Sequence, residues 1–199
     1  MARIAAGFLK GLGLKIPRQV RATEGKVRQA IFNILGASVE GARVLDGFAG
    51  SGALGVEALS RGAREVLFLE ADPVCVRVIG ENVDRIPAET IPGRWRVVPG
   101  DVLRQLQRLA GQQDAFDVIL LDPPYDAPHL GKKSLNTVAG CAILAPSGIL
   151  CLEHARRNPP PPTAGALTLM KQHRYGETVL SFYNSHKAEA HASSLPGDI

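Results

Sequence analysis

Ala-Arg-Val-Leu-Asp-Gly-Phe-Ala-Gly-Ser-Gly, residues 42–52, runs from a short apolar segment through an acid into a glycine-rich loop. Residues 51–61 follow with helical spacing, because Leu54, Ala58 and Leu59 fall on one side and Gly62 ends the pattern. A buried strand, a glycine loop and a helix in that order open a doubly wound α/β domain. The stretch therefore predicts a parallel sheet whose first strand ends at Asp46.

The same alternation of strand and helix continues to about residue 153. Apolar runs at 65–70, 95–98, 116–121 and 148–153 predict strands, and helical patterns between them cover about 73–85, 101–109 and 130–143. These runs lack polar alternation, which is typical of strands buried on both faces. Residues 167–172 and 178–183 predict an antiparallel hairpin that closes the sheet. We expect an α/β, Rossmann-like fold with a mostly parallel, doubly wound sheet.

The two ends of the chain differ from this body. Residues 3–16 carry three glycines among apolar residues and predict a small hairpin, and Thr23 can cap a helix whose apolar face includes Val27, Ile31 and Leu35. Residues 184–199 are polar with little apolar content, which is typical of a loose tail. The predicted organisation is a basic extension over 1–36, a domain over 37–184 and a tail over 185–199.

Charge is unevenly spread along the chain. Residues 1–36 hold seven basic side chains and one acid, a balance of +6, whereas the other 163 residues together carry −2. Such a basic arm on a near-neutral body favours an anionic partner, most simply nucleic acid. A solvated surface segment is the plainer alternative, and charge alone does not decide against it.

Composition excludes several classes of protein. The chain has 199 residues, of which 45% are apolar and 21% charged, as expected for one globular domain. No apolar stretch is long enough for a membrane span, and the first 16 residues do not resemble a signal peptide, so we expect a cytoplasmic protein. Three cysteines, Cys75, Cys141 and Cys151, lack the spacing of zinc ligands or a disulfide framework, so we expect no metal site.

The glycine loop carries the first chemical signal. Gly50-x-Gly52-x-x-Gly55 after a strand, with Glu70 at the end of the next strand, matches the pattern of a dinucleotide site. Asp46 argues against NAD, because a carboxylate beside the loop would repel a pyrophosphate. It would attract a ligand that carries an amino group and a sulfonium, such as S-adenosylmethionine (SAM). The loop therefore favours SAM over NAD.

Three acids at successive strand ends fit the parts of that cofactor. Asp46 would face the amino-acid end, Glu70 would accept from the ribose hydroxyls, and Asp101 would accept from the adenine amine. Acids at strand ends can also merely cap the next helix, an explanation that is reasonable for each acid singly. The expected cofactor site comprises Asp46, Phe48, Gly50, Gly52, Glu70, Ala71, Asp101, Val102 and Asp122.

Asp122-Pro123-Pro124-Tyr125 is the most specific signal, and it follows the fourth strand directly. The two prolines fix the backbone and leave the Pro123 carbonyl as an acceptor beside the Asp122 carboxylate. Two acceptors on a rigid turn suit both hydrogens of a planar NH2 group, while Tyr125 offers a face on which a base can stack. We therefore expect Asp122, Pro123, Pro124 and Tyr125 to form the catalytic turn.

These motifs together resemble the SAM-dependent amino-methyltransferases of nucleic-acid bases, and the whole chain is similar to the RsmD family. The resemblance covers residues 3 to about 183 and includes residues 3–7, 21–35, 44–63 and 174–178, of which the last two blocks are more specific than the glycine loop. It implies transfer of a methyl group from SAM to the N2 amine of a guanine in 16S ribosomal RNA. The implied partner is that RNA or a small-subunit assembly particle, and we expect the protein to bind it as a monomer.

The basic extension departs from the family pattern at several positions. Lys10-Gly11-Leu12 stands where the family usually has Arg-Gly-Arg, and Ala22 stands where a proline is usual. These departures put the identity of the target nucleotide in doubt more than the chemistry. The expected RNA contacts, some of which could instead lie near the methionine end of the cofactor, are Arg3, Lys10, Lys15, Arg18, Arg21, Thr23 and Arg28.

Three rival functions remain open on the sequence. A DNA adenine-N6 or cytosine-N4 methyltransferase shares the Asp-Pro-Pro-Tyr turn, but it normally carries a separate target-recognition domain for which this chain has no room. An inactive SAM-binding or RNA-binding scaffold is opposed by the intact turn at 122–125. A nicotinamide oxidoreductase is opposed by Asp46.

Overall fold

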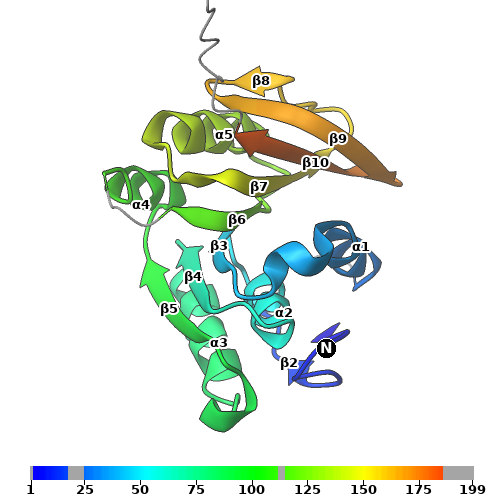
Figure 1. Cartoon of the computed structure of the whole chain (residues 1–199), viewed down its shortest axis with the longest axis vertical. Helices are drawn as coiled ribbons and strands as arrows, with labels where there is room; N and C mark the ends of the chain where they lie inside the picture. The colour runs from blue at the N-terminus through cyan, green and yellow to red at the C-terminus, as the bar shows by residue number, and fades with distance from the viewer. Residues whose placement is uncertain (1, 18–24, 112–114, 186–199) are drawn as a thin grey trace, which may run out of the picture.

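The computed structural model describes residues 2–17, 25–111 and 115–185. A central sheet of eight strands has the order β5-β4-β3-β6-β7-β10-β9-β8 (Figure 1). Neighbouring strands run parallel from β5 to β7, and β10, β9 and β8 are added antiparallel. Their bounds are β3 Arg43–Gly47, β4 Glu65–Glu70, β5 Arg94–Pro99, β6 Phe116–Leu121, β7 Leu144–Ala155, β8 Thr163–Ala164, β9 Leu167–Tyr175 and β10 Thr178–Ser185.

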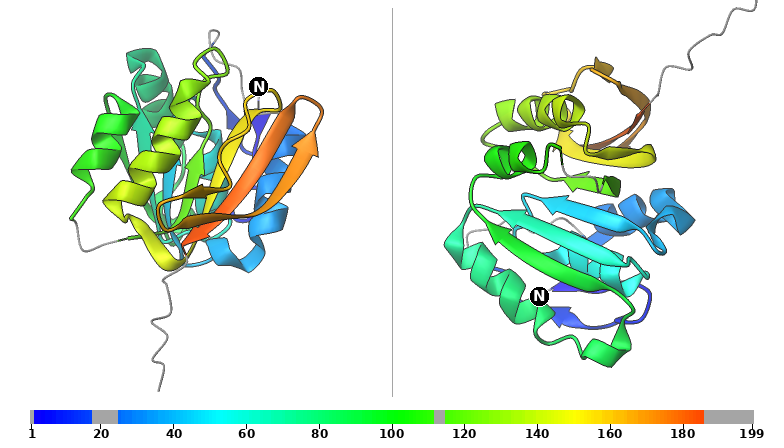
Figure 2. Two further views of the ribbon diagram at one scale, coloured as in Figure 1. Left: turned by 90° about the horizontal axis from the view of Figure 1, so that it is seen from above. Right: turned by 60° about the vertical axis from the view of Figure 1, so that its left-hand side comes forward.

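Helices cover both faces of this sheet, as Figure 2 shows. They are α1 Gly25–Leu35, α2 Ala53–Ser60, α3 Pro73–Val83, α4 Val102–Arg108 and α5 His129–Cys141, with short 3-10 turns η1 Gly36–Val39 and η2 Ala88–Thr90. Because successive strand residues point to opposite faces, β6 sends Val118 and Leu120 to one side and Ile119 and Leu121 to the other. The continuous apolar runs of the sequence thus contribute side chains to two hydrophobic cores, one on each face of the sheet.

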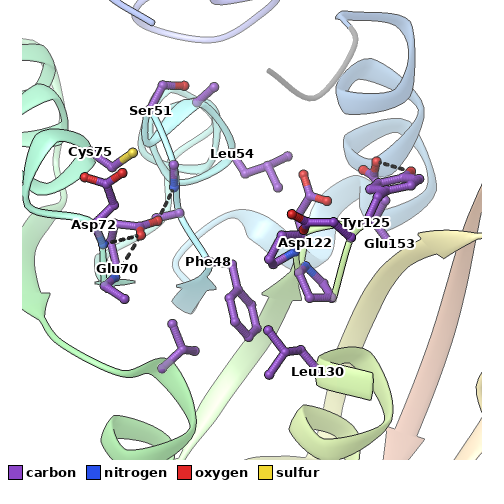
Figure 3. Close-up of a pocket in the computed structure, with 18 of the residues that line it drawn as sticks. Phe48, Ser51, Leu54, Glu70, Asp72, Cys75, Asp122, Tyr125, Leu130 and Glu153 are labelled. Atoms are coloured by element: carbon purple, nitrogen blue, oxygen red, sulfur yellow. Dashed lines mark hydrogen bonds between the residues drawn. The ribbon is translucent and has the colours of Figure 1, made fainter. Parts of the chain in front are cut away.

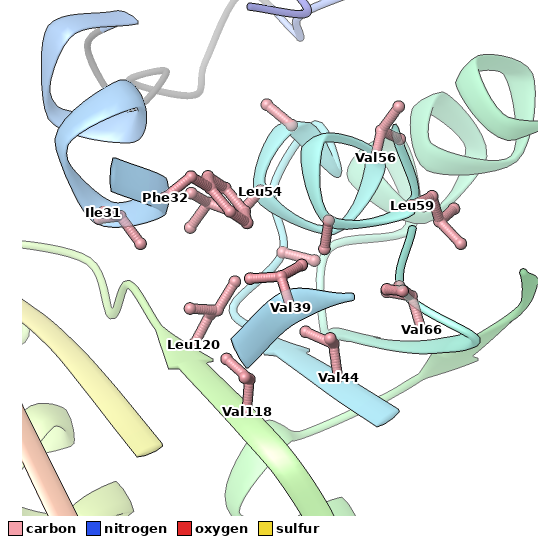
Figure 4. Close-up of a cluster of buried hydrophobic side chains, with 14 of the residues drawn as sticks. Ile31, Phe32, Val39, Val44, Leu54, Val56, Leu59, Val66, Val118 and Leu120 are labelled. Carbon is pink, nitrogen blue, oxygen red and sulfur yellow. The ribbon is translucent and has the colours of Figure 1, made fainter. Parts of the chain in front are cut away.

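The first core lies beneath α1 and α2 (Figure 4). Phe32 of α1 and Leu54 of α2 pack over Val44 and Leu120 of the strands, and all four are buried. The second core lies beneath α4 and α5 and includes Leu106 and Leu135. The Rossmann-like arrangement expected from the sequence, a mostly parallel sheet closed by an antiparallel hairpin, is confirmed.

The N-terminal hairpin, β1 Ala2–Arg3 and β2 Gly13–Leu14, is docked on α2. The buried Glu57 carboxylate accepts from the Ala5 and Ala6 amides at 2.9 and 3.2 Å, and Ser60 Oγ accepts from the Leu9 amide at 2.9 Å. Gly7 has φ +79°, and a Cβ there would lie 1.8 Å from the Ser60 carbonyl oxygen. The hairpin therefore shares the core of the body instead of standing apart from it.

Differences from the sequence expectations are local. Strand β8 was not expected, because only two residues after the proline run pair with β9. Strand β9 extends to Tyr175, so the turn falls at Gly176, whose φ is +61°. Thr23 and most of the tail lie outside the described residues. No described helix has the length and apolarity needed to cross a bilayer.

Candidate active site

A cavity of about 630 Å³ opens at the carboxyl ends of the parallel strands, between the glycine loop and the Asp-Pro-Pro-Tyr turn (Figure 3). This is the edge at which doubly wound sheets bind ligands, and the volume is that of a small-molecule site. Most of the residues expected from the sequence line it: Phe48, Gly50, Glu70, Ala71, Asp101, Val102, Asp122, Pro123, Pro124 and Tyr125. Asp46 and Gly52 do not.

Glu70 holds in place the end of the cavity that the glycine loop forms, which we call the loop end. Its Oε2 accepts from the Gly50 amide at 2.7 Å, and its Oε1 accepts from the Ala71 and Asp72 amides at 2.7 and 2.9 Å. One carboxylate thus ties the glycine loop after β3 to the turn after β4. The sequence assigned Glu70 to the ribose hydroxyls, and that contact stays a prediction. The structure shows a second role, not expected from the sequence, in which Glu70 holds the glycine loop in place.

Phe48 adopts an uncommon backbone conformation in this loop. Its φ is +63°, one of two positive values among the described non-glycine residues. The half-buried ring projects into the cavity and faces Leu130 of α5 (Figure 3). Residues held in sparsely populated backbone regions cluster at ligand sites because the surrounding structure stabilises the strain there. The geometry supports the expectation that Phe48 contacts the ligand.

Asp46 requires a correction. Its side chain is 1% exposed and lies behind the loop, where its Oδ2 accepts from the Gly55 amide at 2.8 Å. Burial, opposed by that hydrogen bond and reinforced by Asp122 and Glu70, raises the pKa of Asp46 to about 8. Burial thus favours the neutral form of this carboxyl, and the residue does not line the cavity. Asp46 positions the start of α2, and the charge argument made from it does not hold.

Gly52 also serves the loop rather than its ligand. It precedes α2 with φ +77°, and a Cβ there would meet Ile79 at 3.3 Å. Gly52 does not line the cavity, so the expected cofactor contact there stays a prediction. The glycine is needed because a left-handed turn must pack tightly on α3.

Asp101 keeps both of the roles weighed from the sequence. Its Oδ1 accepts from the Arg104 amide at 2.9 Å, so the residue caps α4. The exposed side chain also lines the cavity. The helix cap fixes the carboxylate at the rim, which leaves the expected contact with an adenine amine available as a prediction.

The Asp122 turn is anchored to the neighbouring strand. The Asp122 amide donates to the Gly47 carbonyl at 3.3 Å, and the Ala127 amide donates to the Pro124 carbonyl at 3.1 Å. Pro123 is buried and Pro124 is exposed. Since the prolines restrict the backbone between these hydrogen bonds, the half-buried Asp122 carboxylate is presented to the cavity from a rigid turn.

Tyr125 is fixed by two residues that the sequence analysis did not assign to the site. Its hydroxyl donates to Glu153 Oε1 at 2.9 Å (Figure 3) and lies 2.8 Å from Thr178 Oγ1. Glu153, at the end of β7, and Thr178, at the start of β10, are both buried and both line the cavity. Burial raises the pKa of Tyr125 well above its ordinary value. The only sequence signals were a strand-end acid and the block 174–178.

The expected RNA contacts have mixed outcomes. Arg28 is corrected: it is 3% exposed, its Nη2 donates to the Arg3 carbonyl at 2.6 Å, and its Nε lies 3.6 Å from Glu57 Oε2. It joins α1 to the hairpin and cannot reach RNA in this structure. Lys15 pairs with Glu81 at 2.6 Å but stays exposed, as do Arg3 and Lys10. Arg18, Arg21 and Thr23 lie outside the described residues.

The charge of the cavity decides which kind of ligand fits. Six acids line it, and none of the described lining residues is lysine, arginine or histidine. A pyrophosphate would find no cationic partner on this wall, whereas a sulfonium and an amino group would find acceptors. Apolar side chains such as Val102 and Leu103 provide a surface for a purine. The described lining therefore fits SAM without a contribution from Asp46.

The fold and this cavity define a class I SAM-dependent methyltransferase. The family model described as "Conserved hypothetical protein 95" matches residues 2–184, and the chain belongs to this family, which confirms the resemblance to RsmD. Ribosomal RNA small subunit methyltransferase D of Haemophilus influenzae is 31% identical over 186 residues, covering 92% of this chain and 93% of the relative. YlbH of Bacillus subtilis, named a candidate rRNA methyltransferase, is 34% identical over 183 residues, covering 91% and 97%.

Solved structures agree with these relatives. The Escherichia coli protein yhhF, described as a candidate methyltransferase, superposes with a TM-score of 0.79 at 28% identity, covering 93% of this chain and 98% of that one. An RNA methyltransferase of Salinibacter ruber in complex with S-adenosyl-L-homocysteine has a TM-score of 0.61 at 15% identity, covering 89% and 98%. At that identity the second likeness concerns the fold alone.

Proposed function

We propose that this protein transfers a methyl group from SAM to the exocyclic N2 amine of a guanine in 16S ribosomal RNA. The observation that carries the proposal is the rigid Asp122 turn facing an acidic, SAM-compatible cavity, with Tyr125 locked beside it. The names of the relatives supply the RNA class, and the family resemblance supplies the guanine. We further propose that the protein acts in the cytoplasm as a monomer.

The loop end holds the cofactor in this proposal. The Glu70 carboxylate would accept from the ribose hydroxyls while it keeps its three backbone donors, and Asp101 would accept from the adenine amine. Phe48 and Val102 would pack against the flat parts of the ligand. When bound, SAM supplies an electrophilic methyl group on a sulfonium.

The turn end orients the nucleophile. A guanine amine is a weak nucleophile because its lone pair is delocalised into the ring, so alignment is most of the catalysis. The Asp122 carboxylate and the Pro123 carbonyl would accept the two amine hydrogens, and the Tyr125 ring would stack on the flipped base. No residue is needed as an obligatory base, because the methylated ammonium is acidic enough to lose its proton afterwards.

Methyl transfer to defined RNA tests the proposal. Purified protein is incubated with labelled SAM and, separately, with protein-free 16S rRNA, small-subunit particles and double-stranded DNA, and the products are digested to nucleosides. N2-methylguanosine from either ribosomal substrate supports the proposal. Label on DNA adenine or cytosine, or no transfer to any substrate, contradicts it.

A further inference from the structure

A second cavity of about 260 Å³ lies against the catalytic turn. It shares Pro123, Pro124, Tyr125 and Glu153 with the first cavity, so the turn forms a common wall between the two. Pro128 at the start of α5 and Pro159 and Pro160 after β7 also line the second cavity. Proline rings are apolar, so they add surface on which a base can pack.

Four lysine and arginine side chains lie at or beside the rim of this cavity. Lys132 of α5 lines it, Lys133 follows Lys132, and Arg156 and Arg157 lie between the lining residues Ala155 and Asn158. All four are exposed. Within the described part of the chain, none of them takes part in an ion pair, in contrast to Lys15 and Arg28 of the basic extension. Their charge remains available to a partner.

An apolar wall beside unpaired cations matches the chemistry of a nucleotide. The base packs on the flat surface, and the cations neutralise the phosphates that flank it. Position adds a second argument, because the two cavities share the residues of the turn. A nucleotide that adjoins a base held in the first cavity would therefore lie close to the second.

We propose that the second cavity and its basic rim bind the nucleotide that adjoins the target guanine in the RNA. This proposal rests on the proposed function and names a contact surface for the same substrate. It places the RNA on the α5–β7 side of the molecule in addition to any contact made by the N-terminal segment. The four rim cations would neutralise the phosphates on either side of the flipped base.

Steady-state kinetics with a control variant at a distant surface position tests this site. The variant Lys132→Ala/Arg156→Ala/Arg157→Ala is compared with Arg96→Ala, which removes an exposed cation from β5 at the other side of the sheet. We expect the KM for RNA to rise about tenfold or more. The slope of the logarithm of RNA affinity against the logarithm of salt concentration should decrease in magnitude by roughly 0.7 for each phosphate contact that is lost. The KM for SAM and the melting temperature should match those of the control.

Cross-linking locates the contact directly. RNA that carries 4-thiouridine next to the target guanine is irradiated with the parent protein, and the labelled peptide is identified by mass spectrometry. Attachment within residues 123–132 or 152–160 supports the proposal, and attachment only elsewhere overturns it.

The kinetic outcomes separate the two proposals. If the parent methylates rRNA and the triple variant behaves like Arg96→Ala, the second site is wrong and the proposed function stands. If the variant loses activity on the particle but not on protein-free rRNA, the rim contacts a ribosomal protein and the nucleotide site is wrong. If the parent methylates no rRNA, both proposals fall.

Discussion

The two ends of the active-site cavity are built in different ways. At the loop end, one side chain, Glu70, holds three backbone amides from two neighbouring turns. At the turn end, Tyr125 is held by side chains from β7 and β10, 28 and 53 residues away in the chain. The loop end thus depends on backbone geometry and suits binding, whereas the turn end depends on side-chain placement and suits alignment. Changes at the two ends should therefore affect different measured quantities.

The largest effect is expected for Asp122→Ala. Loss of the amine acceptor should lower kcat by about a hundredfold or more, as for other preorganised polar groups in active sites. SAM affinity should change little, because the glycine loop is untouched. Single-turnover methylation and calorimetry measure the two quantities, and Asp126→Ala, an exposed acid on the same cavity wall, is the control. Equal activity of the two variants would remove the turn from the mechanism.

Glu70→Ala should have the next largest effect, at the loop end. The variant loses a charged acceptor for three amides and for the ribose, and one such hydrogen bond contributes about 1.5–3 kcal/mol. We expect SAM affinity to fall at least tenfold, with a lower melting temperature. Glu70→Gln should recover part of both. Unchanged SAM affinity in calorimetry would show that the loop does not hold the cofactor.

Thr178→Val should have a smaller effect, confined to kcat. The variant keeps the shape of the side chain but removes one hydrogen-bond partner of the Tyr125 hydroxyl, a loss of about 1 kcal/mol or roughly fivefold in rate. Thr178→Ser should restore the rate, and the KM for SAM should be the same in all three proteins. A rise in the KM for SAM with constant kcat would mean that Thr178 serves the loop end.

Asp46→Asn should alter only the pH dependence of stability. The folded-state pKa of about 8 lies above the unfolded value, so the neutral carboxyl is favoured by folding. Stability should therefore fall as pH rises from about 4 to 8, where the unfolded chain ionises first. Asparagine can still accept from Gly55 but does not titrate, so the melting temperature of the variant should decline less over this range. Parallel curves for both proteins would contradict the raised pKa.

Local patterns predicted most of the fold, because each strand and helix is defined by neighbouring residues. The strands at 65–70 and 116–121 have the expected bounds, since uninterrupted apolar runs leave few alternatives. The turn at 122–125 was also identified, because it directly follows one of those strands. Strand β8 could not be predicted, because two residues carry no periodicity.

The sequence could not show where each charged side chain lies in the folded protein. Asp46 was expected to face the ligand, yet it is buried behind the loop, and Arg28 was counted with the RNA contacts, yet it pairs with Glu57 in the core. Glu153 and Thr178 join the site only because β7 and β10 are neighbours in the sheet. These facts depend on tertiary packing, which neither the net charge of a segment nor its spacing contains.

The measurement that tests the central claim most directly is transfer of labelled methyl from SAM to 16S rRNA by the parent protein and by Asp122→Ala, with nucleoside analysis of the product. The account predicts N2-methylguanosine from the parent and at least a hundredfold slower transfer by the variant, at equal SAM affinity. A variant as fast as the parent, or label recovered on any nucleoside other than guanosine, would contradict it.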